Sequence, residues 1–87
     1  MRIAYSDKSL KQLKKLDHSI SNRIVDYLDA VAKLKNPRSR GKALVGNLAG
    51  IWRYRVGDYR ILCRIKDDAL EILVVEIAHR RNVYDNE

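Results

Sequence analysis

Apolar residues in the first part of the chain recur with the period of an α-helix. Those of residues 7–16 lie three apart, and those of residues 20–35 follow the 3.6-residue period closely, so we predict a helix over each range. Ser6 or Asp7 can cap the first helix, and Ser19 can cap the second. Because the link between the two is short, the helices should form a hairpin.

The rest of the chain has the patterns of β-strands. Residues 51–56 and 59–65 alternate between apolar and polar positions, whereas residues 70–77 are apolar nearly throughout, as in a central strand covered on both faces. Residues 2–5 are a further short strand candidate. We therefore predict one α+β domain over residues 1–87, with the order β-α-α-β-β-β and an antiparallel sheet packed on the N-terminal helical hairpin.

A two-residue turn sets the register of the first strand pair. Gly57 and Asp58 separate two alternating runs, which is typical of a tight hairpin. Paired residues point to the same side of a sheet, so one side is apolar and should pack on the helices, with Trp52 and Cys63 on it. The opposite side, which we call the arginine face, carries Arg53, Arg55, Arg60 and Arg64.

A second turn extends this prediction toward the end of the chain. With Asp67 and Asp68 as its loop, Arg60 pairs with Val75, and His79 falls on the arginine face further along the strand. A β-bulge would shift the register by one residue. We therefore predict that His79 stands close to the arginines.

The charge of the chain favours a polyanionic partner. Eighteen Lys and Arg residues against 11 Asp and Glu residues give a net charge of +7. Arginines that lie opposite each other repel, but their planar guanidinium groups suit phosphate, so a phosphate-binding face is favoured over a solvated one. The irregular basic stretch 38–47 and the helix lysines, among them Lys11 and Lys14, could contact phosphates or simply be solvated.

Other chemistry has less support in the sequence. With one cysteine the chain can form no internal disulfide, and no apolar run approaches the roughly 20 residues of a membrane span, so we expect a cytoplasmic protein without membrane contact. We find no metal-ligand cluster or glycine-rich phosphate loop and expect no cofactor. Metal-free RNA cleavage needs only charge and proton transfer around an attacking 2′-hydroxyl. His79 is the one nearby side chain of a type that titrates near neutral pH.

Three stretches of the chain resemble the RelE/ParE superfamily of toxins, and the resemblance covers nearly the whole length. They are residues 44–48, 51–61 and 77–84, which contain Trp52-Arg53-Tyr54-Arg55 and His79-Arg80-Arg81. The resemblance implies the toxin component of a type II toxin–antitoxin system. In the RelE-like branch it implies a ribosome-dependent mRNA endonuclease that acts in the 30S decoding site, contacts ribosomal RNA, inhibits translation and is silenced by a cognate antitoxin protein.

The resemblance also implies roles for individual residues. Arg60 would stabilise the transition state, Arg80 would lie near the leaving oxygen, and Tyr84 would lie by the substrate base. The predicted catalytic residues are Arg60, His79, Arg80 and Tyr84, and the predicted RNA-binding residues are Arg53, Arg55, Arg64, Arg81, Lys11 and Lys14.

The resemblance leaves two questions open. The RelE prototype has lysines where this chain has Arg53 and Arg55, and arginine hardly ever deprotonates, so either His79 or an arginine could be the general base. ParE-like members share the fold and often the strand motif, but they inhibit DNA gyrase without catalysis. They generally lack the complete terminal set of residues, so the nuclease function is favoured.

Overall fold

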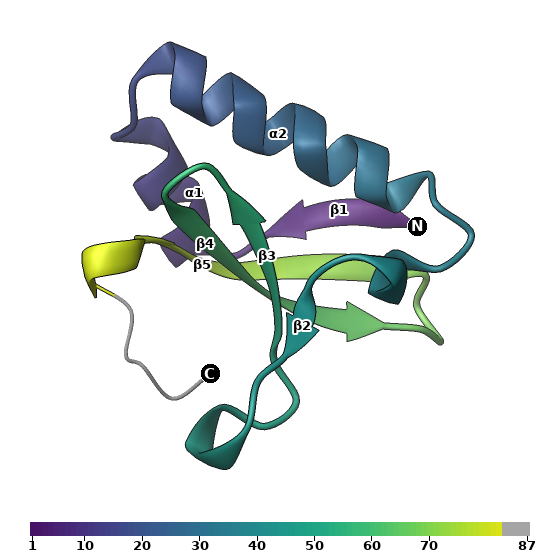
Figure 1. Ribbon diagram of the computed structural model, residues 1–87. Helices are drawn as coiled ribbons and strands as arrows, with labels where there is room; N and C mark the ends of the chain where they lie inside the picture. The colour runs from purple at the N-terminus through teal and green to yellow at the C-terminus, as the bar shows by residue number, and fades with distance from the viewer. Residues whose placement is uncertain (83–87) are drawn as a thin grey trace.

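The computed structural model describes residues 1–82, which form an α+β fold (Figure 1). The helices are α1 (Asp7–Lys14) and α2 (His18–Ala32), and the strands are β1 (Arg2–Tyr5), β2 (Lys42–Ala43), β3 (Trp52–Val56), β4 (Tyr59–Lys66) and β5 (Glu71–His79). Three short 3-10 helices are η1 (Pro37–Ser39), η2 (Gly46–Leu48) and η3 (Arg80–Asn82). The predicted fold class is confirmed.

Both predicted helices are present, with different ends. Ser6 caps α1, because its side-chain oxygen accepts a hydrogen bond from Ser9 N at 3.1 Å. The prediction that Ser19 caps the second helix is wrong. The N-cap residue of α2 is Asp17, whose carbonyl accepts hydrogen bonds from Ile20 N and Ser21 N. Ser19 therefore lies within the first turn of α2.

The sheet is mixed, whereas the sequence predicted an antiparallel one. Its strand order is β1-β5-β4-β3-β2, and β1 runs parallel to β5 while the other pairs are antiparallel. A parallel pair needs a long connection, which the helices and the two hairpins supply here. The short strand β2 lies in the stretch that was predicted to be irregular, with Lys42 opposite Arg53.

The two helices cover different parts of the sheet (Figure 1). β1 pairs only with the first half of β5, and α1 continues along the second half. There the side chain of Ser9 donates to the Val74 carbonyl at 2.8 Å, and Ile77 N donates to Gln12 Oε1 at 2.7 Å. Side chains of α1 thus satisfy backbone groups at the edge of β5 that no strand reaches.

The main core lies between α2 and one face of the sheet. Its fully buried side chains are Ile24, Leu28 and Val31 of α2 with Tyr54, Ile61, Cys63, Ile72 and Val74 of the strands. On the arginine face, a smaller apolar cluster contains Leu44, Ile51 and Leu62, with Leu48 and Val75 partly buried against it. Within the described residues, no helix is long and apolar enough to cross a membrane.

The two hairpins differ in how well the sequence predicted them. The β3–β4 register is confirmed: the turn at Gly57 and Asp58 leaves Arg55 opposite Arg60. The β4–β5 turn spans four residues, not two, and pairs Lys66 with Glu71. The predicted pairing of the second hairpin is therefore wrong from its first residue.

A bulge then moves His79 to the other side of the sheet. The register shifts between Leu62 and Cys63, because Val75 is an extra residue on β5. As a result His79 pairs with Tyr59, whose side chain packs on the helix side. The prediction that His79 lies on the arginine face is wrong.

Candidate functional site

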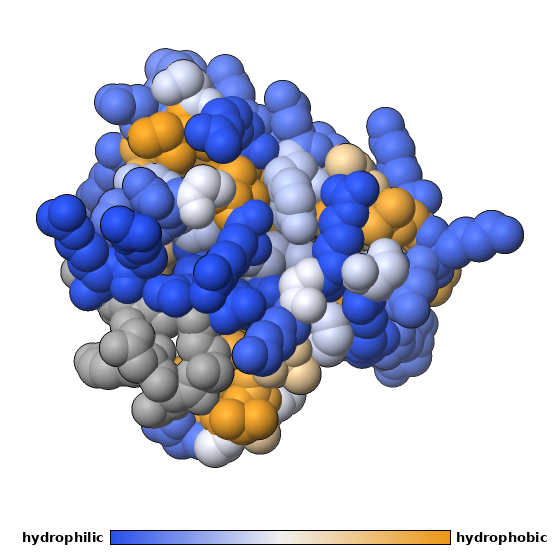
Figure 2. Space-filling view, viewed as in Figure 1, coloured by the Kyte–Doolittle hydropathy of each residue, from blue (hydrophilic) through white to orange (hydrophobic). Residues whose placement is uncertain are grey.

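Three arginines surround a cavity at the β3–β4 turn. The cavity has a volume of about 150 Å³ and is lined by Arg55, Gly57, Asp58, Tyr59, Arg60 and Arg80. We call it the arginine cavity. Its lining comes from β3, the turn, β4 and η3, and Figure 2 shows hydrophilic side chains gathered over this part of the molecule. Among the described residues of the lining, three are cationic and one is acidic.

The hairpin turn holds η3 in place beside the cavity. Arg80 N donates a hydrogen bond to the Asp58 carbonyl at 2.8 Å, and Arg60 Nη1 donates to the Arg80 carbonyl at 3.2 Å. Arg80 Nη1 also lies 3.9 Å from Asp58 Oδ1. These contacts hold Arg80 beside the hairpin turn, next to the pair formed by Arg55 and Arg60.

The tight turn itself depends on a glycine. Gly57 has φ +58°, which is the left-handed region that a two-residue hairpin turn requires and that residues with a Cβ seldom adopt. The turn brings Arg55 and Arg60 opposite each other at the end of both strands. The local sequence therefore places two like charges side by side, at a cost to the stability of the strand pair.

The other two arginines of the arginine face do not line the cavity. Arg53 is only 8% exposed, so it is poorly placed for direct contact with a large ligand. Arg64 is exposed, but its guanidinium lies near Gly50. It stands four residues beyond Arg60 on β4, roughly 13 Å along the strand. The predicted face is thus divided into one compact site and two separate side chains.

The remaining predicted residues lie in several places. Lys11 and Lys14 are exposed on α1, and Lys14 lines a groove between the helices, not the arginine cavity. Arg81 is exposed and follows Arg80 in η3. His79 lines a different cavity on the α1 side of the sheet. Tyr84 lies outside the described residues.

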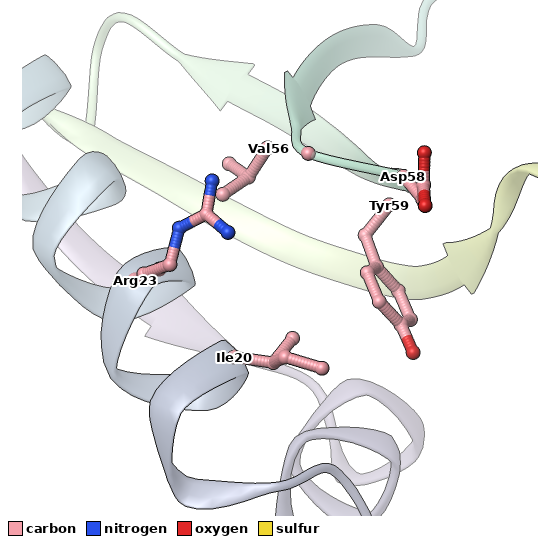
Figure 3. A pocket seen from close by; sticks show the side chains of 6 residues that line it. Ile20, Arg23, Val56, Asp58 and Tyr59 are labelled. Atoms are coloured by element: carbon pink, nitrogen blue, oxygen red, sulfur yellow. The ribbon is translucent and has the colours of Figure 1, made fainter.

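A further arginine approaches the turn from α2 and was not predicted from the sequence. Arg23 lines a cavity of about 180 Å³ together with Ile20, Val56, Gly57, Asp58 and Tyr59. Figure 3 shows its guanidinium reaching from α2 toward the hairpin, with Asp58 on the far side of the turn. The sequence shows Arg23 only as one polar position of a helix, and packing of α2 against the hairpin brings it here.

Burial and charge also define what the other polar groups can do. Burial raises the pKa of the Cys63 thiol to about 12, so this thiol is a poor nucleophile at neutral pH. Among residues 1–82, no three His, Cys, Asp or Glu side chains group in a way that could hold a metal ion. The arrangement at the turn suits the binding of an anionic group and the stabilisation of negative charge on it.

Comparisons with known proteins found a matching family model and similar curated proteins. The family model described as "ParE toxin of type II toxin-antitoxin system, parDE" matches residues 3–84. Toxin RelG of Mycobacterium tuberculosis (strain ATCC 25618 / H37Rv) is 30% identical over 83 residues, which cover 94% of this chain and 93% of the relative. Toxin RelE of the same strain is 29% identical over 82 residues, which cover 94% and 84%.

A solved structure is similar over nearly the same length. The structure of the toxin–antitoxin complex RelBE2 from Mycobacterium tuberculosis contains a chain that matches with a TM-score of 0.82 and 27% identity. The match covers 93% of this chain and 92% of that one. The mixed sheet and the two helices are therefore an arrangement that other solved proteins share.

Proposed function

Because the chain belongs to the RelE/ParE superfamily and is a toxin of a type II toxin–antitoxin system, we propose that it is a ribosome-dependent endoribonuclease that cleaves messenger RNA. The observation that carries the proposal is the arginine cavity, where Arg55, Arg60 and Arg80 meet from three elements of the fold. The similarity to proteins named Toxin RelG and Toxin RelE supports the nuclease branch.

The proposed reaction uses the substrate's own 2′-hydroxyl. The hydroxyl loses its proton to solvent as its oxygen bonds to the adjacent phosphorus. The bond from phosphorus to the 5′-oxygen breaks, and this oxygen takes up a proton from solvent, so the products are a 2′,3′-cyclic phosphate and a 5′-hydroxyl. Negative charge grows on the phosphate oxygens in the transition state, where fixed cationic donors lower the barrier most. We assign Arg55 to phosphate binding, Arg60 to the transition state, Arg80 to the leaving oxygen and Tyr84 to the substrate base.

The proposed function also requires the ribosome, which would position the substrate. An open cavity of about 150 Å³ can hold a phosphate group but offers little surface for recognising a message. We therefore propose that the 30S decoding site and its ribosomal RNA position the messenger RNA, which places the activity in the cytoplasm. Exposed cations such as Lys11, Lys14, Arg64 and Arg81 are candidates for contacts with RNA around the site.

We also propose that a cognate antitoxin protein silences the toxin. The similar RelBE2 structure was solved as a toxin–antitoxin complex. A segment that carries acidic side chains into the arginine cavity would compete directly with a substrate phosphate, because both groups would need the same guanidinium donors.

Primer extension on a message in a reconstituted translation reaction tests the nuclease. The wild type should cut only when ribosomes are present, and Arg60→Ala should lower the cleavage rate by about 100- to 1000-fold, as expected for a lost donor to the transition state. Arg38→Ala is the matched control, because Arg38 contacts Asp67 at the opposite end of the sheet. An intact message under wild-type conditions would refute the nuclease proposal.

A second candidate function is inhibition of DNA gyrase without catalysis. It is favoured by the match to the family model described as a ParE toxin. In that case the arginine cavity would bind an acidic surface of a protein target. A gyrase supercoiling assay separates the two: inhibition with an intact message supports the ParE-like function, and cleavage without inhibition supports the nuclease.

A further inference from the structure

His79 occupies a well-defined place on the helix side of the sheet. Its ring meets the ring of Tyr59 edge to face, with centroids 5.3 Å apart and an interplanar angle of 87°. The two residues pair across β4 and β5, and both line a cavity with Gln12 of α1 and Lys15, the C-cap residue of that helix. Tyr59 therefore restricts the orientation of the imidazole, which points away from the arginine face.

The imidazole makes a specific contact with the turn that follows it. Arg81 N donates a hydrogen bond to His79 Nδ1 at 3.3 Å. An acceptor side chain that bonds to the N–H two residues later is the arrangement of a helix N-cap, and here the capped element is η3. Since η3 contains Arg80, the residue that caps it also helps to place a side chain of the arginine cavity.

The same short turn is fixed from the hairpin side. Asp58 accepts the N–H of Arg80 through its carbonyl, and Arg60 donates to the carbonyl of Arg80. The cap therefore acts on a segment that two hydrogen bonds also tie to residues of the arginine cavity. Loss of the cap would release the Arg81 end of η3 and allow the direction of Arg80 to change.

We propose that His79 is a positioning residue, which caps η3 and thereby orients Arg80, and that it does not exchange a proton with the substrate. This inference rests on the proposed nuclease function. A misplacement of a reacting group by about 1 Å can cost roughly 100-fold in rate. The cap would therefore let a histidine on the opposite side of the sheet influence the cleavage rate.

Two substitutions separate positioning from proton transfer. In His79→Asn, Oδ1 stands the same number of bonds from Cβ as Nδ1 does in histidine, so the cap is kept while the titratable group is lost. In His79→Gln, the polar group stands one bond further out, and in His79→Ala it is absent. We expect His79→Asn to cleave within about threefold of the wild type, and the other two variants to lose about 10- to 100-fold.

The cleavage results and a second measurement together decide the proposal. Equal loss in His79→Asn and His79→Ala would overturn it, because removal of a general acid or base costs about 100- to 10 000-fold whatever replaces it. Wild-type rates in all three variants would overturn it as well.

Amide hydrogen exchange of the isolated toxin tests the cap without reference to catalysis. The Arg81 N–H should be protected in the wild type and in His79→Asn, and should exchange faster in His79→Ala and His79→Gln. Equal exchange in all four proteins would overturn the cap even if the wild type cleaves RNA. If the wild type does not cleave RNA but the exchange pattern holds, the nuclease proposal fails while the capping role stands.

Discussion

The two ends of the sheet hold their cationic side chains in different ways. At the β4–β5 end, Arg2 and Lys66 both contact Glu71, at 3.1 and 3.8 Å, and Arg38 contacts Asp67 at 2.9 Å. At the β3–β4 end, three arginines and one aspartate line a cavity. Among the described residues, these contacts of the first end join three cations to two separate carboxylates, whereas the second end gathers three guanidinium groups around one cavity.

This difference shows that the arrangement of charges is more informative than their number. Exposed ion pairs contribute little to stability, and a cation already beside a carboxylate has little to gain from a phosphate. Cations gathered around one cavity repel each other, and an anion bound between them interacts favourably with all of them. A net charge of +7 therefore indicates a polyanionic partner without locating its site.

Neutralising one arginine at each end of the sheet should give the largest difference in cleavage rate. Arg55→Gln removes a cation of the arginine cavity. We expect the cleavage rate to fall by about 10- to 100-fold, because this is the effect of losing one charge-assisted hydrogen bond to the substrate. Arg2→Gln removes a cation that is paired with Glu71 and should change cleavage by less than about twofold. Cleavage rates on ribosomes measure both variants.

Salt dependence provides an independent check on this contrast. If Arg55 binds phosphate, the slope of log affinity for single-stranded RNA against log salt should become shallower by about 0.7 in Arg55→Gln and stay constant in Arg2→Gln. Equal effects of the two substitutions on both measurements would mean that the two ends do not differ in function.

A substitution in the core, which leaves the charged residues unchanged, should lower the stability of the protein and have an effect of intermediate size. Tyr54 is fully buried, and its hydroxyl donates to the Pro37 carbonyl at 2.8 Å. Tyr54→Phe leaves that carbonyl without its donor, so the free energy of unfolding should fall by about 1–3 kcal/mol. Urea denaturation measures the loss.

Cleavage by Tyr54→Phe at 25 °C should stay within about twofold of the wild type, because the substitution leaves the arginine cavity intact. A loss of cleavage as large as that of Arg55→Gln, in a protein that is still folded, would show that the core and the cavity are coupled.

The two hairpins explain how much of the fold the sequence could predict. Gly57 marks a two-residue turn because that turn needs a left-handed residue, so the β3–β4 register follows from local chemistry. The four-residue turn of β4–β5 instead has Leu70 at φ +53°, a conformation for which leucine is an unusual choice. Residues 72–75 are all apolar, so no alternation reveals that Val75 is the extra residue of a bulge.

Only the part of the candidate site that depends on the local turn at Gly57 could be predicted from the sequence. The pairing of Arg55 with Arg60 follows from the first hairpin and is confirmed. The burial of Arg53 and the approach of Arg23 to the turn depend on tertiary packing, which strand or helix patterns do not contain. The side of the sheet that His79 occupies depends on the bulge.

The smallest expected effect concerns the β4–β5 end at low pH. The hydrogen bond from Arg38 lowers the pKa of the Asp67 carboxyl below its ordinary value. The folded state then binds a proton less readily than the unfolded state, so the contribution to stability is present above the unfolded pKa and is lost as the pH falls through the folded pKa.

Asp67→Asn should therefore be slightly less stable than the wild type at neutral pH, and the difference should vanish by about pH 2, well below the ordinary aspartate pKa of about 3.9. Urea denaturation at several pH values measures it, and Arg38→Gln should show the same pattern because it removes the other partner. Cleavage at neutral pH should be unchanged in both, since neither residue lines the arginine cavity. A stability difference that persists at pH 2 would mean that the contact stabilises by packing and not by charge, and the β4–β5 end could then no longer be described as a set of ion pairs.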